Sequence, residues 1–84
     1  MRPATAQVLK MNKAYFSGRL RQYRQSKGWS QQEMADMLAV WLDRPITKSY
    51  YQKLEQGAKP ATQELALELS RFTKIRTAEL VVRK

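Results

Sequence analysis

Hydrophobic residues recur at helical spacing in the first third of the chain. Phe16, Leu20 and Tyr23 stand at intervals of four and three positions, so they would share one face of a helix. Asn12 precedes this pattern, and asparagine is a preferred residue at the N-cap of a helix. We therefore expect a first helix from Asn12 to about Lys27.

The second predicted helix has the clearest start in the chain. Gly28 is expected to end the helix before it, because glycine adopts a left-handed conformation at little cost. Ser30 and Glu33 then match a capping box, in which each side chain bonds the other residue's backbone N–H. Pro45 disfavours helical geometry in the residue before it, so a turn is expected there. The hydrophobic residues at core spacing within this helix are Met34, Ala35, Leu38 and Leu42.

Three further helices complete the prediction, each beginning at a threonine that can serve as its N-cap: Thr47, Thr62 and Thr77. Gly57 is expected to end the first of them. The alternating patterns and hairpin dipeptides typical of strands are weak or absent. Five helices joined by short turns therefore predict an all-α fold. Their inward-facing residues are expected to be Tyr51 and Leu54, then Leu65, Leu69 and Phe72, and finally Leu80 and Val81.

The charge balance indicates a polyanionic partner. The 84 residues suffice for one small domain, and 16 Lys and Arg against 7 Asp and Glu give a formal net charge of +9. A small domain this basic favours nucleic acid first and an anionic membrane surface second. The membrane surface is disfavoured because the apolar helix faces are needed for a core.

The chain begins with a basic segment that lacks a clear hydrophobic period. The first acidic residue is Glu33, and Pro3 lies within the first eleven residues. We expect residues 1–11 to form a flexible N-terminal arm and residues 12–84 to form the domain. The arm either follows a DNA groove and its phosphates or serves as a solubilising tail.

Several classes of chemistry lack the residues they need. The sequence has no cysteine and no histidine, so disulfides, thiolate metal sites and His- or Cys-based catalysis have no basis. The acidic residues are scattered, which disfavours a carboxylate metal site. The longest apolar run, Ala39 to Leu42, is too short to span a bilayer. We expect no enzymatic activity, no cofactor, no metal, no small-molecule ligand and a cytoplasmic location.

Residues 20–81 resemble the phage repressor/Cro family of helix-turn-helix proteins, also called the XRE family. The resemblance rests on an ordered series of motifs. The segment Lys27-Gly28-Trp29-Ser30-Gln31 is similar to the family's entry into its second helix, and Leu54-Glu55-Gln56-Gly57 is similar to the exit from its recognition helix. The resemblance implies a lambda-repressor-like domain of five helices that binds double-stranded DNA.

The chain departs from the family pattern in two places. The stretch between Ala35 and Gly57 is about six residues longer than usual, with the extra length at residues 39–45. A longer second helix, a longer turn, or both must replace the usual tight turn. Lys74 also stands where the family usually has a glycine before its last helix.

The recognition helix of this family places the side chains of its N-terminal part in the major groove. Base-reading side chains must be polar and long enough to reach base edges there. Lysine can donate to guanine O6 and N7, and glutamine can pair with adenine N6 and N7. The expected base contacts are Lys48, Ser49, Gln52 and Lys53, of which the resemblance implies Lys48, Ser49 and Lys53.

A second set of residues is expected to contact the DNA backbone and fix the docking register. Gln31 and Gln32 open the second helix, where free amides and the helix dipole suit a phosphate. Tyr50 has a further interpretation, because its ring could contact a thymine methyl group or simply cover the helix. The full set is Gln31, Gln32, Arg44, Tyr50, Gln56, Lys59, Arg19 and Arg21.

The resemblance also implies structural roles for a few residues. Arg24 and Glu55 occupy positions that often form an ion pair between the first helix and the recognition helix, which a bidentate geometry would orient. Trp29 is expected to pack in the core. Trp41 lies in the unusual stretch, where it either packs or contacts a second copy or a partner protein.

Together these patterns predict a sequence-specific, DNA-binding transcriptional regulator of bacterial or phage type that acts as a homodimer on a palindromic operator. Two-fold pairing doubles the contact, since one domain reaches only a half-site. A second regulatory protein is a further expected partner. Two alternatives remain: a helix-turn-helix module that binds a protein, as antitoxins or polymerase-binding domains do, and a non-specific architectural nucleic-acid binder.

Overall fold

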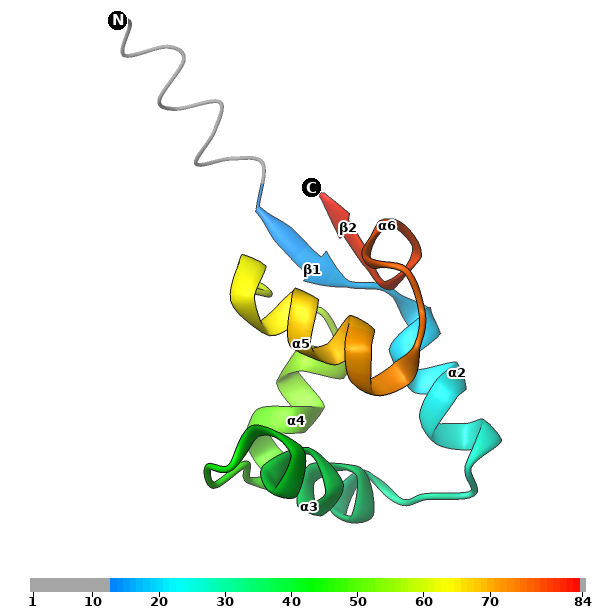
Figure 1. Cartoon of the computed structure of the whole chain (residues 1–84), viewed down its shortest axis with the longest axis vertical. Helices are drawn as coiled ribbons and strands as arrows, with labels where there is room; N and C mark the ends of the chain where they lie inside the picture. The colour runs from blue at the N-terminus through cyan, green and yellow to red at the C-terminus, as the bar shows by residue number, and fades with distance from the viewer. Residues whose placement is uncertain (1–12, 84) are drawn as a thin grey trace, which may run out of the picture.

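The computed structural model describes residues 13–83, and five helices make up most of this part of the chain (Figure 1). The lambda-repressor-like, all-α class expected from the sequence is confirmed, with one small sheet added to it. The elements in order are β1 (Ala14–Phe16), α2 (Gly18–Ser26), α3 (Gln31–Leu42), α4 (Lys48–Glu55), α5 (Gln63–Thr73), α6 (Thr77–Leu80) and β2 (Val81–Arg83).

The start of the first helix was predicted wrongly. Residues 14–16 form strand β1, and α2 begins only after Ser17, whose hydroxyl accepts a hydrogen bond from the Arg19 amide at 3.2 Å. Phe16 still reaches the core, but it does so from the strand and not from a helix face. The expected N-cap, Asn12, lies outside the described residues.

The sheet explains this error, because it depends on residues far apart in the sequence. β1 pairs with β2 in antiparallel register, with Phe16 opposite Val81. The Ser17 amide and hydroxyl also donate to the carbonyls of Leu80 and Glu79, each at 2.8 Å. Local periodicity carries no information on such pairing. Val81, expected in the last helix, therefore belongs to a strand.

Most of the predicted helix caps are present. Ser30 and Glu33 form both bonds of the capping box, and the hydroxyls of Thr47 and Thr62 accept backbone amides at the starts of α4 and α5. Thr77 was predicted wrongly as a cap. It is the first residue of α6, and the N-cap Arg76 makes no side-chain capping bond.

Both departures from the family pattern have a local structural solution. The extra residues lengthen α3 to Leu42 and add a turn that starts at Asp43, which adopts a left-handed conformation with φ of 55°. The Arg44 amide donates a hydrogen bond to the Ala39 carbonyl at 3.2 Å and so caps the C-terminal end of α3. Lys74 likewise adopts φ of 63° where a glycine was expected, so it ends α5 without one.

The core lies where α2, α3, α4 and α5 converge, and residues from β1 and α6 close it. An aromatic cluster extends it at one side, where the rings of Tyr23, Trp29 and Trp41 surround Phe72 at centroid distances of 5.5 to 6.5 Å. Trp29 thus packs against the core at partial exposure. The largest fully buried side chains are Tyr51, Leu20, Met34, Leu38, Leu54, Leu69 and Leu80.

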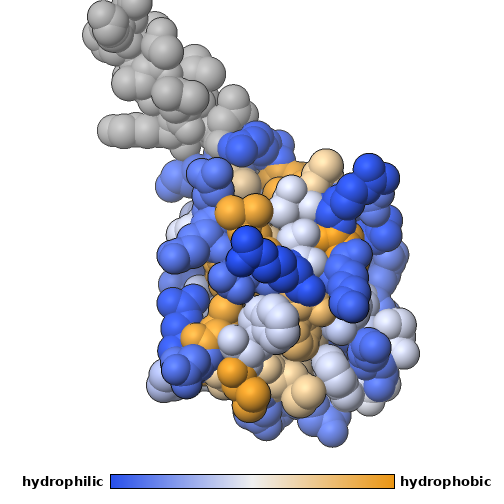
Figure 2. Space-filling view, viewed as in Figure 1, coloured by the Kyte–Doolittle hydropathy of each residue, from blue (hydrophilic) through white to orange (hydrophobic). Residues whose placement is uncertain are grey.

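The elements are arranged so that the sheet and α3 lie at opposite ends of the molecule, with α4 and α5 between them (Figure 1). Hydrophobic residues on the face shown in Figure 2 form small patches separated by hydrophilic ones. Within residues 13–83, no helix combines the length and the apolar character needed to cross a membrane.

Candidate nucleic-acid interface

The α4 helix presents a polar edge to solvent. Lys48, Ser49 and Lys53 are exposed and Gln52 is half-buried, while Tyr51 on the opposite side is fully buried. Residues at intervals of three and four positions share one helix face, which places these four polar side chains along a single edge. Their exposure means that no described part of the chain, including the lengthened end of α3, folds across this edge.

The turn before α4 fixes where this edge begins. Ile46 is buried, with 8% of its surface exposed, and anchors the turn to the core. Thr47 follows in an extended conformation and its hydroxyl accepts the Tyr50 amide at 3.0 Å. A side-chain cap satisfies one of the free amides of the first turn. The start of α4 is therefore fixed in spite of the longer connection to α3.

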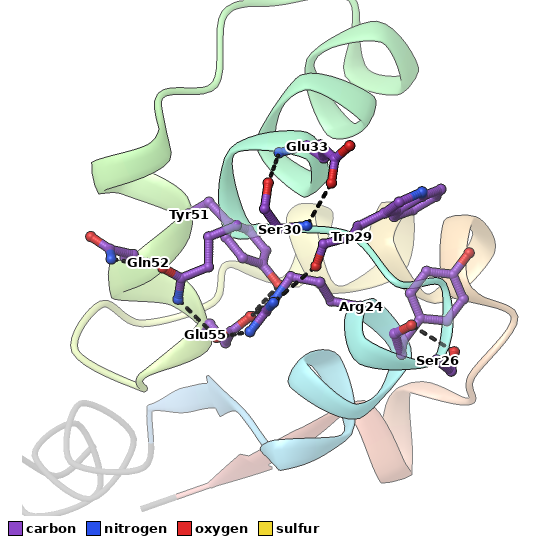
Figure 3. A network of polar contacts seen from close by, with 10 residues as sticks. Arg24, Ser26, Trp29, Ser30, Glu33, Tyr51, Gln52 and Glu55 are labelled. Carbon is purple, nitrogen blue, oxygen red and sulfur yellow. Dashed lines mark hydrogen bonds and ion pairs between the residues drawn. The ribbon is translucent and has the colours of Figure 1, made fainter.

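Arg24 and Glu55 form the ion pair expected from the sequence, and it joins α2 to α4 (Figure 3). Arg24 Nε donates to Glu55 Oε2 at 2.7 Å, and a second guanidinium nitrogen donates to Oε1 at 3.1 Å. The third nitrogen donates to the Trp29 carbonyl at 3.0 Å, in the loop that leads into α3. One guanidinium thus connects α2, the start of α3 and the end of α4.

The carboxylate of Glu55 collects four donors in total. Tyr51 Oη donates to Oε2 at 2.5 Å, and Gln31 Nε2 donates to Oε1 at 3.1 Å, besides the two bonds from Arg24. The tyrosine stands four residues before Glu55 on α4, which is the spacing at which helix side chains meet. The sequence analysis assigned Tyr51 only to the core. The Tyr51 hydroxyl lies one helical turn from the Glu55 carboxylate, and this spacing in the sequence was the signal that Tyr51 could also act as a hydrogen-bond donor.

The charged groups of this cluster are largely buried, and their pKa values are shifted. Only 13% of the Arg24 side chain and 5% of the Glu55 side chain are exposed. Burial opposes ionisation of Glu55, but the hydrogen bonds from Arg24, Tyr51 and Gln31 outweigh it and lower the pKa of the carboxyl. The hydrogen bond to Glu55 raises the pKa of Arg24. Burial, followed by the bond to the carboxylate, raises the pKa of Tyr51 well above its ordinary range.

Gln31 and Gln52 are brought together by the fold, which the sequence analysis did not foresee. Gln52 Nε2 donates to Gln31 Oε1 at 2.7 Å, and Gln31 in turn donates to Glu55. The first residue of α3 and the outer edge of α4 are therefore linked by a chain of side-chain hydrogen bonds. This chain orients Gln52, the half-buried member of the polar edge.

The other expected backbone-contact residues differ in how closely they adjoin α4. Arg44, Gln56 and Lys59 are exposed on either side of it, and the Lys59 ammonium lies 5.8 Å from the ring centroid of half-buried Tyr50. Gln32 is exposed on the first turn of α3 and donates to Asp36 at 2.9 Å.

The two arginines on α2 lie apart from this group. Arg19 stands near the start of α2, beside the sheet, and forms an ion pair of 3.1 Å with Glu79 of α6. Arg21 is exposed on the same helix. The structure therefore brings the α3 and α4 residues together and leaves Arg19 engaged elsewhere.

These features define a class of protein. Helix α3, a turn and helix α4, with an exposed polar edge on the second helix and a buried ion pair behind it, constitute a helix-turn-helix unit. The family model described as "Helix-turn-helix" matches residues 20–80, and the chain belongs to this DNA-binding family of the repressor/Cro (XRE) type. No curated protein and no solved structure matches the chain.

Proposed function

We propose that this protein is a sequence-specific transcriptional regulator that inserts the polar edge of α4 into the major groove of an operator. The observation that carries the proposal is the exposure of Lys48, Ser49 and Lys53 on a helix whose opposite side is locked in the core. A recognition helix needs both features, because base contacts require a free edge and a fixed docking angle.

The chemistry of this edge suits direct readout of bases. Lys48 and Lys53 can donate to guanine O6 and N7, and the Ser49 hydroxyl can donate or accept with any base. Gln52 can pair with adenine through its amide, in an orientation that Gln31 helps to set. A good base contact contributes about 1–3 kcal/mol of discrimination against the wrong base.

The neighbouring cations and amides supply contacts to phosphates. Gln31 and Gln32 lie on the first turn of α3, whose free amides and dipole favour an anion. Such contacts fix the register of the protein on the duplex without reading its sequence. Arg44, Tyr50, Gln56 and Lys59 beside α4 are proposed for this role, as are Arg19 and Arg21 on α2, which lie apart from α4.

We also propose that the protein acts as a homodimer through the α6–β2 end of the molecule. A groove of about 630 Å³ with a mixed polar and apolar lining lies there between the sheet, α5 and α6; Leu67 in its lining is 45% exposed, and Val82 on β2 is 40% exposed. One α4 edge covers only a half-site, so a second copy is the occupant that the DNA geometry requires. Lysine in place of Val82 is expected to lower the mass measured by sedimentation from dimer to monomer.

Selection of bound sites from a random duplex library tests the proposal most directly. We expect an enriched palindromic sequence that is bound at least about a thousandfold more tightly than random duplex. Affinity should also fall steeply as salt increases, since each neutralised phosphate releases counterions. Equal affinity for selected and random duplex would instead identify an architectural binder.

A further inference from the structure

The outer face of α3 carries a hydrophobic stripe that the DNA-binding edge does not use. Met37, Val40 and Trp41 are 42%, 80% and 48% exposed, and their spacing places them on one helix face. They are three of the five large hydrophobic residues that are exposed in residues 13–83. Exposed apolar side chains that cluster, as opposed to occurring singly, mark an interaction site.

A groove continues this stripe onto α5. Its volume is about 400 Å³, and its apolar lining comes from Trp41, Leu42, Tyr50 and Leu65. One side of the Trp41 indole is fixed against Phe72, at a centroid distance of 5.5 Å with the rings edge to face. An aromatic ring held in this way offers a rigid apolar wall at little entropic cost.

The charge around this surface is opposite to that of the chain as a whole. Helix α3 contains two acidic residues and no basic one, although the chain has a net charge of +9. Glu33 and Asp36 stand one helical turn before Met37 and Val40. Five of the seven acidic residues lie on α3, at its C-cap or on the groove wall of α5: Glu33, Asp36, Asp43, Glu64 and Glu68.

Most of these carboxylates are not neutralised by the protein itself. Glu68 forms a 3.5 Å ion pair with Arg71, and Arg44 stands at the rim of the groove. Within residues 13–83, Asp36, Asp43 and Glu64 have no ion-pair partner. Five carboxylates exceed the two guanidinium groups and the Lys59 ammonium beside Tyr50, so this surface is acidic.

We propose that the α3–α5 surface, made of the stripe and the groove, binds a basic segment of another protein through an apolar anchor residue. The anchor would lie in the groove against the Trp41 ring, and Lys or Arg side chains on either side would lie over the free carboxylates. DNA is repelled by the same carboxylates. A second copy is disfavoured, because a two-fold contact places a patch against itself and would bring like charges together.

This surface is separate from the edge that the proposed DNA contact uses. The base-reading side chains are on α4 and the stripe is on α3; the two surfaces adjoin at Gln32, which donates to Asp36 at 2.9 Å, and at Arg44 and Tyr50, which line the groove. The inference therefore does not depend on the proposed function. A DNA-bound molecule would still present the stripe on α3.

The test uses the ¹⁵N-labelled full chain and a synthetic helical peptide of about 15 residues with two leucine anchors one turn apart and flanking lysines. Amide shifts are expected on α3 from Met37 to Asp43, on α5 from Glu64 to Glu68 and at Tyr50 on the groove wall, with the rest of α4 unaffected. A peptide with glutamate in place of each lysine should bind at least about tenfold more weakly.

Matched variants separate local charge from net charge. E64Q combined with E68Q removes two negative charges at the groove, and Q22K combined with Q25K adds two positive charges on exposed positions of α2. The E64Q and E68Q pair should lower the affinity for the lysine peptide by about tenfold, and the Q22K and Q25K pair should lower it by less than about twofold. Thermal unfolding of each variant checks that it is folded.

Several results would each overturn the inference. They are shifts centred on α4 or on the α6–β2 end, equal binding of the glutamate peptide, equal weakening by both variant pairs, and no localised shift at about 1 mM peptide. Concentration-dependent broadening of the stripe without peptide would also overturn it, because it would identify a second copy as the occupant.

Discussion

The two ends of helix α3 differ in almost every physical respect. At its N-terminus, Gln31 is tied by hydrogen bonds to Gln52 and Glu55, and the capping box closes the first turn. At its C-terminus, Val40 and Trp41 are exposed and the nearby carboxylates are mostly unpaired. The N-terminal end of α3 is thus tethered by hydrogen bonds to the proposed DNA-reading helix. The C-terminal end is free, in the sense that its outer side chains are exposed to solvent.

This contrast shows how a single short helix can serve two surfaces of opposite charge. The tethered end depends on one carboxylate that accepts four hydrogen bonds, so its geometry is determined inside the protein. At the free end, Val40 contacts solvent, so it can be changed without disturbing the core, although Trp41 also packs on Phe72. The two ends should therefore respond very differently to substitution.

The largest effect is expected from Glu55→Ala at the tethered end. It removes the partner of a buried guanidinium and leaves Arg24, Tyr51 and Gln31 without their acceptor. Breaking one side of a buried pair costs about 3–5 kcal/mol. Urea unfolding should show a loss of about 3 kcal/mol, and Glu64→Ala, an exposed control, a loss below about 0.5 kcal/mol. An unchanged melting temperature for Glu55→Ala would contradict the role given to the pair.

Acidification should weaken the same cluster by a smaller amount. The folded-state pKa of Glu55 is lowered below the ordinary value of a glutamate, so the unfolded chain binds its proton first as the pH falls. The stability that this carboxylate contributes is complete above that value and decreases as the pH falls through the lower pKa of the folded state. Urea unfolding across this acidic range should show a steeper loss in the native protein than in Glu55→Gln. An equal loss of stability with falling pH in the two proteins would mean that Glu55 does not determine the destabilisation by acid.

The tethered end was also the more predictable from the sequence. The capping box is predictable because Ser30 and Glu33 match a local sequence motif. The Arg24–Glu55 pair is predictable because the family often has an ion pair at these two positions. The β1–β2 pairing was missed because its hydrogen bonds join residues 65 to 69 positions apart, and no local pattern encodes them. The Gln31–Gln52 bond was missed for a related reason, since it depends on the crossing of α3 and α4.

The free end was predicted only in outline. Trp41 sits at core spacing from Leu38, which favours packing, and a contact with a second copy or a partner protein was the alternative. The structure confirms the packing, since the indole contacts Phe72, and leaves 48% of the residue exposed. Whether a side chain at the border of a core is covered depends on the neighbouring helix, which its own periodicity does not specify.

Substitution of Lys48 on the polar edge of α4 tests the base contacts proposed for this edge. Lys48→Ala should reduce the preference for one base pair of the selected operator by about 1–3 kcal/mol and leave affinity for random duplex nearly unchanged. The measurement is a set of fluorescence-anisotropy titrations with the selected duplex and its single-base variants. A uniform loss on every duplex would place Lys48 on a phosphate instead.

A smaller and sequence-independent effect is expected from Lys59→Ala. Its ammonium lies beside the Tyr50 ring at the flank of α4, where a phosphate contact is proposed. Affinity for selected and random duplex should fall by similar factors, and the slope of log affinity against log salt should become shallower by about one ion. A loss restricted to the selected duplex would give Lys59 a role in base readout.

The smallest effect is expected at the free end, from Val40→Ser. Val40 is 80% exposed, so its methyl groups contribute little apolar burial to the folded state. The free energy of unfolding should change by less than about 0.5 kcal/mol, whereas Leu38→Ala, two residues earlier on the buried side of the same helix, should cost about 2–5 kcal/mol. The same Val40→Ser variant should bind operator DNA normally and the lysine peptide more weakly. If Val40→Ser instead destabilised the protein as much as Leu38→Ala, the outer face of α3 would belong to the core and could not serve a partner.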